Sequence, residues 1–194
     1  LTTQYPRRPK SAARRLAKPA PSNDSQPGEG LGIGARAVGL AVGATTTIST
    51  LSITATPALH GPSGTPRIHE VIGFLLESPG QPTVWISGDT VMHPELHAAL
   101  SAFHAAGKRI DVAVVHCGAV RFPKLPVLGN RLFTFDAAQA IEAVKLIEPD
   151  LIVPIHRSGW THFRQPEDDL RKAFDAAGLA TRTRFLELGE TLSL

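Results

Sequence analysis

The sequence predicts an α/β fold, a mixed sheet with flanking helices, and three observations indicate it. Residues 45–56 and 71–76 are rich in β-branched side chains and separated by loop-forming residues, which is typical of antiparallel strands. From residue 94 onward, segments with a helical apolar stripe alternate with short apolar runs, which is typical of strands joined by helices. Between these halves, the apolar run at residues 84–87 leads directly into Gly88 and Asp89.

The first half of the domain is expected to be an antiparallel meander. Its four strands are predicted at residues 45–50, 51–56, 71–76 and 84–87. Proline and glycine at positions 79 and 80 favour a turn that brings the chain back into the last of these strands.

The second half is expected to alternate helices with buried strands. The first helix begins at Pro94 and ends at Gly107, and the second begins at an Asp136–Gln139 capping box. A third helix follows Pro166, where three carboxylates occupy the first turn and complement the helix dipole. Continuous apolar runs at residues 110–115 and 151–155 predict buried strands, and residues 185–194 are expected to end the chain as a strand or hairpin.

Residues 1–37 have the composition of an irregular, basic tail rather than of a packed domain. Residues 1–30 hold six basic side chains against two acidic ones, a net charge of +4 in a chain whose total is +3. The basic character therefore belongs to the tail, and a nucleic-acid-binding face on the folded part is not expected. We expect residues 38–194 to form the folded domain.

The remaining composition narrows the class of protein. Hydrophobic residues make up 42% of the chain, and no apolar run has the length of a membrane span, so no membrane partner is expected. Cys117 is the single cysteine, which excludes an internal disulfide and fits a reducing compartment, so a cytoplasmic location is predicted.

Three predicted strands lead into side chains that bind metals. His60 follows the strand at residues 51–56, Asp89 follows the run at 84–87, and His156 follows the run at 151–155. Imidazole and carboxylate groups suit zinc or iron, so convergence of these strand ends on one cation is the main hypothesis.

Four further side chains are candidates for contact with a substrate. His116 ends the apolar run at residues 110–115 and is expected on the same rim, because parallel strands bring ligands to their carboxyl ends. His162 lies on the loop that follows His156, and Arg121 and Arg157 are placed to meet an anionic substrate.

Three short motifs carry a resemblance to a known family. They are TPALHGP at residues 56–62, SGDT at residues 87–90 and VPIH at residues 153–156. In order and spacing they resemble the metallo-β-lactamase superfamily, in particular the branch of zinc-dependent hydrolases similar to ascorbate-6-phosphate lactonases. The resemblance implies that residues 38–194 form the C-terminal portion of an αββα sandwich.

The resemblance also implies a two-metal site and a reaction. His60 would ligate the first metal, Asp89 would bridge both metals as the central catalytic carboxylate, and His156 would ligate the second. Zinc is the expected metal, with iron or manganese as alternatives. The expected activity is hydrolysis of a small-molecule ester, lactone or phosphoester by a metal-activated water.

One departure from the family pattern leaves two hypotheses open. The superfamily carries a His-x-His-x-Asp-His motif ahead of the first of these motifs, whereas the first histidine here is His60. The chain is therefore expected to be either a metal-dependent hydrolase or an N-terminally incomplete remnant with at most weak metal binding. An incomplete sandwich leaves one sheet face uncovered, so self-association through that face is also expected.

Overall fold

A computed structural model describes residues 38–62, 70–124 and 128–194 of the chain. Within it, residues 41–194 form one compact unit that contains all of the strands and helices described. The predicted tail at residues 1–37 lies outside the described residues, so its irregular character and its boundary stay predictions.

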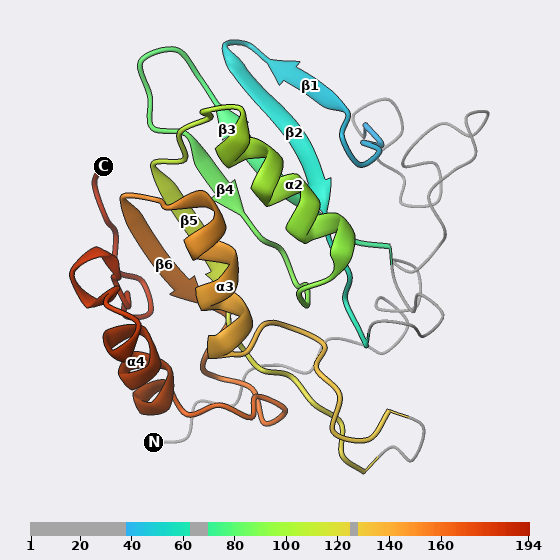
Figure 1. Cartoon of the computed structure of the whole chain (residues 1–194), viewed down its shortest axis with the longest axis vertical. Helices are drawn as coiled ribbons and strands as arrows, with labels where there is room; N and C mark the ends of the chain where they lie inside the picture. The colour runs from blue at the N-terminus through green and yellow to red at the C-terminus, as the bar shows by residue number, and fades with distance from the viewer. Residues whose placement is uncertain (1–37, 63–69, 125–127) are drawn as a thin grey trace. The chain divides into compact units, whose positions relative to one another are not determined.

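The unit is built on one mixed sheet of six strands in the order β1-β2-β3-β4-β5-β6 (Figure 1). Neighbouring strands are antiparallel from β1 to β4 and parallel from β4 to β6. This arrangement confirms the predicted α/β fold with a meander followed by a parallel half. The strands are β1 (Thr45–Ile48), β2 (Leu51–Pro57), β3 (Ile72–Glu77), β4 (Val84–Ile86), β5 (Val112–His116) and β6 (Leu151–Ile155).

Helices α2 (Pro94–Ala105) and α3 (Ala137–Ile147) lie over one face of this sheet, and α4 (Glu167–Ala176) lies beside α3 (Figure 1). Their starts follow the sequence signals, since Pro94 opens α2 and the Asp136 side chain accepts a hydrogen bond from the backbone N–H of Gln139 at 3.1 Å. None of the helices in the described ranges is both long and apolar enough to cross a membrane.

The Gln139 side chain has a different partner from the one that a capping box implies. Its Oε1 accepts a hydrogen bond from the backbone N–H of Met92 at 3.1 Å instead of turning back to Asp136. Helix α3 is therefore fastened to the segment that follows Asp89, a tertiary contact that local sequence signals do not reveal.

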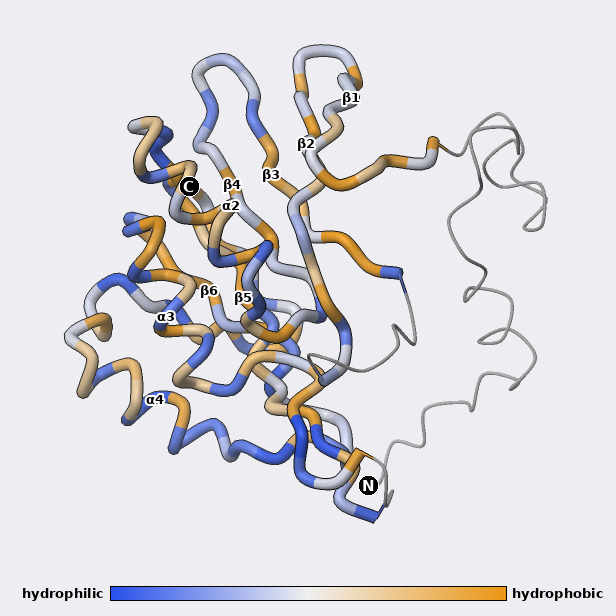
Figure 2. The backbone as a smooth tube through the Cα atoms, turned by 45° about the vertical axis from the view of Figure 1, so that its right-hand side comes forward, coloured by the Kyte–Doolittle hydropathy of each residue, from blue (hydrophilic) through white to orange (hydrophobic). Residues whose placement is uncertain are grey.

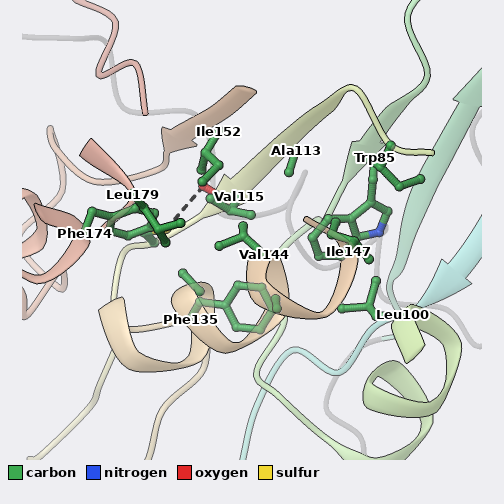
Figure 3. Packing of buried hydrophobic residues seen from close by; sticks show 14 of the residues in the cluster. Trp85, Leu100, Ala113, Val115, Phe135, Val144, Ile147, Ile152, Phe174 and Leu179 are labelled. Carbon is green, nitrogen blue, oxygen red and sulfur yellow. Dashed lines mark hydrogen bonds between the residues drawn. The ribbon is translucent and has the colours of Figure 1, made fainter. Parts of the chain in front are cut away.

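The main core lies between the sheet and the helices. Trp85, Ala113 and Ile152 of β4, β5 and β6 belong to one buried cluster with Val144 and Ile147 of α3, and Figure 3 shows Trp85 beside Ile147. Helix α4 closes the far side of this core with Leu170 and Phe174, and Figure 2 shows apolar and hydrophilic residues alternating along the helix.

The predicted strand or hairpin at residues 185–194 is wrong. Helix α4 is followed by a short 3₁₀ helix, η3 (Ala180–Arg182). Thr183, directly after it, makes an isolated parallel bridge to Ile152 of β6, and no described strand follows. The chain then turns at Gly189, which has φ of 85°, and Leu188 is 93% exposed. The N–H of Glu190 donates to the Glu187 carbonyl at 3.0 Å, so a turn interrupts the alternating leucines and they do not continue as one strand.

The sheet face opposite the helices is apolar but only partly buried. Successive side chains of a strand point to opposite faces, so the residues next to the core residues Leu75, Trp85 and Ala113 lie on this face. The register of the strands places these side chains in two rows across the sheet. These partly exposed residues are Ile53, Leu76 and Val84 in one row and Phe74, Ile86 and Val114 in the other.

This face generates a prediction about association. Because apolar residues spread over four strands are costly to leave in water, we expect the chain to self-associate through this face as its concentration rises. Phe74→Glu should shift the chain toward the monomer, whereas Leu188→Glu, which changes an exposed leucine elsewhere, should not. Sedimentation velocity over a concentration series measures this, and an unmodified chain that stays monomeric throughout would contradict it.

Candidate metal centre

The direction of the strands brings the predicted ligands to one edge of the sheet. Strands β2, β4, β5 and β6 all run the same way, so their carboxyl ends meet at that edge. His116 is the last residue of β5, His156 follows β6 directly, and His60 and Asp89 lie three residues beyond β2 and β4. Together with His162, on the loop after His156, these residues form the strand-end cluster.

Two of the loops that carry the cluster are fastened to each other. The backbone N–H of Leu59 donates to Thr90 Oγ1 at 2.9 Å, and the N–H of Val91 donates to the Leu59 carbonyl at 3.0 Å. Thr90 is fully buried and lies next to Asp89, as Leu59 lies next to His60. These two hydrogen bonds hold the loop of His60 against the loop of Asp89.

Asp89 and His156 form the closest contact of the cluster. Asp89 Oδ1 lies 3.3 Å from His156 Nδ1, a separation that also falls within ion-pair range. Both atoms are nevertheless shielded from solvent without any hydrogen-bond partner, so the approach lacks the geometry of a hydrogen bond. An unpartnered buried polar atom costs about 1–3 kcal/mol, so something beyond the described contacts is expected to satisfy both.

A metal ion meets that requirement. In a tetrahedral site with bonds of about 2.0–2.1 Å, two neighbouring ligand atoms lie about 3.3–3.4 Å apart. The distance from Asp89 Oδ1 to His156 Nδ1 agrees with this spacing, and a carboxylate oxygen with an imidazole nitrogen is a donor pair suited to zinc or iron. The pair therefore fits a metal.

His156 adopts a strained backbone conformation. Its φ is 55°, in the left-handed region that residues other than glycine seldom occupy. Such a conformation costs on the order of 1–3 kcal/mol and persists where the surrounding structure enforces it. Gly118 is part of that enforcement, because a Cβ built there would stand 2.8 Å from the His156 carbonyl oxygen and 2.9 Å from the Phe163 ring.

His116 is held by Ser87, a fully buried residue at the end of β4. The Ser87 hydroxyl donates to the Gly88 carbonyl at 2.9 Å and accepts from the His116 backbone N–H at 3.0 Å. Its oxygen also lies 3.1 Å from His116 Nδ1. Since the hydroxyl proton is used on Gly88, Nδ1–H is the donor in this contact, and Nε2 keeps its lone pair.

Burial favours the neutral form of the two histidines nearest Asp89. The pKa of His116 lies below its ordinary value because burial disfavours the charged imidazolium, although Asp89 opposes this shift. Burial likewise lowers the pKa of His156, and nearby His162 and His60 add to the lowering against Asp89. A neutral imidazole is the form that binds metal.

His60 and His162 lie at the border of the cluster. The His60 ring donates from Nδ1 to the Phe133 carbonyl at 2.9 Å, which directs the lone pair to Nε2. His162 packs against the rings of Phe122 and Trp160, and burial followed by the charge of Arg164 lowers its pKa.

The two predicted arginines have different surroundings. Arg157 contacts Glu167, the Leu186 carbonyl and the Phe185 ring, so its side chain faces α4 and the C-terminal segment. The structure does not bring it to the cluster. Arg121 lies on the loop after β5, where it pairs with Asp136 at 3.4 Å and donates to the Asn130 carbonyl.

Of the strand-end residues predicted to converge on one cation, only Asp89 and His156 have atoms at the spacing of metal ligands. Within the described ranges, no group of three or more His, Cys, Asp and Glu side chains is arranged to hold a metal ion. Asp89 and His156 have ligand spacing, and His60, His116 and His162 lie around them.

Sequence reasoning misses the residues that position the cluster. Ser87 lies in the SGDT motif, where its residue type indicates only a loop, and Gly118 belongs to none of the three motifs. A glycine directly after His116-Cys117 at a predicted strand end is the signal that could have found it, since glycine permits close backbone approach.

Comparison with known proteins relates this arrangement to a family. A model of the Beta-lactamase superfamily domain matches residues 7–157. A curated relative, a UPF0173 metal-dependent hydrolase of Pelotomaculum thermopropionicum, is 28% identical over 167 residues, which cover 83% of this chain and 65% of that protein. The chain thus spans slightly less than two thirds of this relative's length.

Solved structures show the same fold. An isothiocyanate hydrolase from Delia radicum gut bacteria has a TM-score of 0.65 at 18% identity, and the match covers 77% of this chain and 57% of that one. Igni18, a metallo hydrolase from Ignicoccus hospitalis, has a TM-score of 0.57 at 25% identity, and the match covers 80% of this chain and 59% of that one.

The contact between Gly118 and His156 generates a prediction. Gly118→Ala should cost about 1–3 kcal/mol of folding free energy and displace His156, because the new methyl group overlaps the His156 carbonyl. Gly107→Ala is the matched control: its φ of 65° makes alanine costly there too, but nothing lies within 4 Å of its Cβ, so the loss of stability should not displace His156. NMR signals of the His156 ring should move in the first variant alone; unchanged signals in both would contradict the positioning role.

Proposed function

The chain belongs to the β-lactamase superfamily, and from this premise we propose that it is a metal-dependent hydrolase whose reaction takes place at the strand-end cluster. The observation that carries the proposal is the pair of shielded, unpartnered atoms, Asp89 Oδ1 and His156 Nδ1, at 3.3 Å. A hydrolase site at this edge also agrees with the position of ligand sites in parallel sheets.

The residues of the cluster divide the work of the proposed site. Asp89 and His156 would hold the metal, and His60 and His116, each with its Nδ1 in a hydrogen bond, lie at the same edge of the sheet. A bound divalent metal would supply a water of lowered pKa and polarise the substrate. Neutral His116 and His162 can accept a proton or a hydrogen bond from a substrate, because burial lowers their pKa values.

The finer assignments rest on the chemistry of the cluster. Zinc is the proposed metal, with iron or manganese as alternatives, since one carboxylate with imidazoles suits each of them. The proposed substrate is a small-molecule ester, lactone or phosphoester, all of which a metal-activated water attacks. The cytoplasm is the proposed compartment because the single cysteine, Cys117, is a free and buried thiol.

A second candidate function follows from the ligand count. Because no three ligand side chains converge within the described ranges, the alternative is a chain that by itself holds metal weakly and hydrolyses nothing. Catalytic zinc normally has three protein ligands, so hydrolase activity needs a third ligand, through a ring movement of His60 or His116 or from outside the described residues.

Substitution of Asp89 tests the proposal. Asp89→Asn keeps the size of the side chain and removes its charge, so zinc retention should fall roughly tenfold or more. Asp150→Asn is the matched control: that carboxylate precedes β6 at the opposite edge of the sheet and pairs with Arg109. Titration calorimetry with zinc measures both.

Three outcomes separate the candidates. Loss of zinc binding and of esterase activity in Asp89→Asn, with both kept in Asp150→Asn, supports the hydrolase. Zinc binding without hydrolysis of any ester, lactone or phosphoester tested supports the second candidate. Equal zinc affinity in the unmodified chain and in Asp89→Asn contradicts the site.

A further inference from the structure

A hollow of about 280 Å³ lies beside the strand-end cluster. Three of the segments that line it adjoin residues of the cluster. Val91 and Met92 follow the Asp89-Thr90 turn, Pro62 lies two residues after His60, and Leu132 precedes Phe133, whose carbonyl accepts from His60. None of the five cluster residues lines the hollow, but their chain neighbours do, so the hollow and the cluster share the same loops.

Two arginines give this hollow its chemistry. Arg121 and Arg131 both line it. The Arg121 side chain is 26% exposed and is oriented by Asp136 and the Asn130 carbonyl. Arg131 is exposed, and no carboxylate of the described residues lies within ion-pair distance of it. Its charge is thus available to a ligand.

Charge in the surrounding loops is one-sided. Apart from Arg157, which contacts Glu167, the loops at residues 117–135 and 157–166 contain four basic side chains and no acidic one. Arg164 lies close enough to His162 to lower its pKa, and its Nε donates to the Arg121 carbonyl at 3.5 Å. The Asp136 carboxylate is shared between Arg121 and the first turn of α3, so a net positive field remains at the hollow.

The rest of the lining fits a small organic anion. Pro62, Val91, Met92 and Leu132 supply an apolar wall. Gln139 Oε1 accepts from the Met92 N–H, which leaves the amide nitrogen of Gln139 as a donor. An apolar wall with a few converging donors is the usual composition of a small-molecule site.

A larger hollow, of about 450 Å³, has the opposite character. It lies at the other edge of the sheet, and its charged lining residues are Asp111 and Asp150, both paired with Arg109. No cationic side chain is among its described lining residues, so we expect an anion to bind beside the cluster and not there.

We propose that the hollow with Arg121 and Arg131 binds a carboxylate or phosphate group of the substrate, which makes the substrate an anionic ester or lactone. The guanidinium group recognises both anions through paired hydrogen bonds. This inference deepens the proposed function and rests on it for the location of the reacting bond, whereas the binding of the anion itself does not require the metal.

Anion binding to the full chain tests the proposal, with phenyl phosphate and benzoate as probes. The arginine Nε–H signals of ¹⁵N-labelled chain are followed by NMR, once in chelator and once with zinc. Saturable shifts of the Arg121 and Arg131 signals are expected under both conditions. The probe that binds more tightly identifies the anion as phosphate or carboxylate.

Variants assign the binding to the hollow. Arg131→Gln changes an exposed side chain, so folding should be unaffected, and affinity should fall about tenfold. Arg121→Gln should weaken binding similarly, and Arg109→Gln is the matched control with unchanged affinity. An absence of saturable binding in chelator, or equal affinity in Arg131→Gln and the unmodified chain, would overturn the proposal.

The two proposals fail separately. Asp89→Asn should keep its affinity for the anion in chelator, because the hollow does not include that carboxylate. If the chain binds the anion but retains no zinc, the proposed anion site stands and the proposed metal-dependent hydrolase is refuted. Zinc binding without any response of Arg121 and Arg131 would refute the hollow alone.

Discussion

The arrangement at the sheet edge depends on one close contact between two polar atoms that both lack a hydrogen-bond partner. Asp89 Oδ1 and His156 Nδ1 face each other at 3.3 Å, shielded from water and without a hydrogen bond. Burying two such atoms is unfavourable unless a third partner satisfies both. The left-handed backbone of His156 adds a second cost at the same place. Costs concentrated in one place are typical of binding sites, and we propose a cation as the partner that offsets them here.

The rest of the fold supplies the means to hold this contact. Strands β4, β5 and β6 run parallel, which brings their ends together. Buried Thr90 ties the Asp89 loop to the His60 loop, and Ser87 fixes the ring of His116. Gly118 lets the loop after β5 approach His156 closely. Each of these small residues positions a histidine or Asp89. None of them is proposed to contact a bound metal or substrate.

Much of the fold could be predicted from the sequence, because its signals are local. The start of α2 at Pro94, the cap at Asp136 and the apolar runs of the parallel strands depend on neighbouring residues alone. The segment after α4 could not, because its path depends on tertiary contacts: the bridge between Thr183 and Ile152, and the hydrogen bond from Arg157 to the Leu186 carbonyl.

The candidate site could be predicted only in part. His60, Asp89, His116 and His156 are recognisable because metal-binding residue types follow strand signals. The direction of Arg157 was not predictable, since Glu167 and Phe185 compete for its guanidinium from segments farther along the chain. Arg131 and the hollow beside the cluster escape sequence reasoning for a related reason: the hollow is formed by segments that are distant in sequence and meet only in the fold.

Locating a metal directly is the most decisive measurement. Crystals of the chain grown with zinc, measured on both sides of the zinc absorption edge, would give an anomalous density peak at the position of the ion. We predict a peak within bonding distance of both Asp89 Oδ1 and His156 Nδ1. A peak elsewhere, or ordered Asp89 and His156 side chains with no peak between them, would contradict a metal centre at this pair.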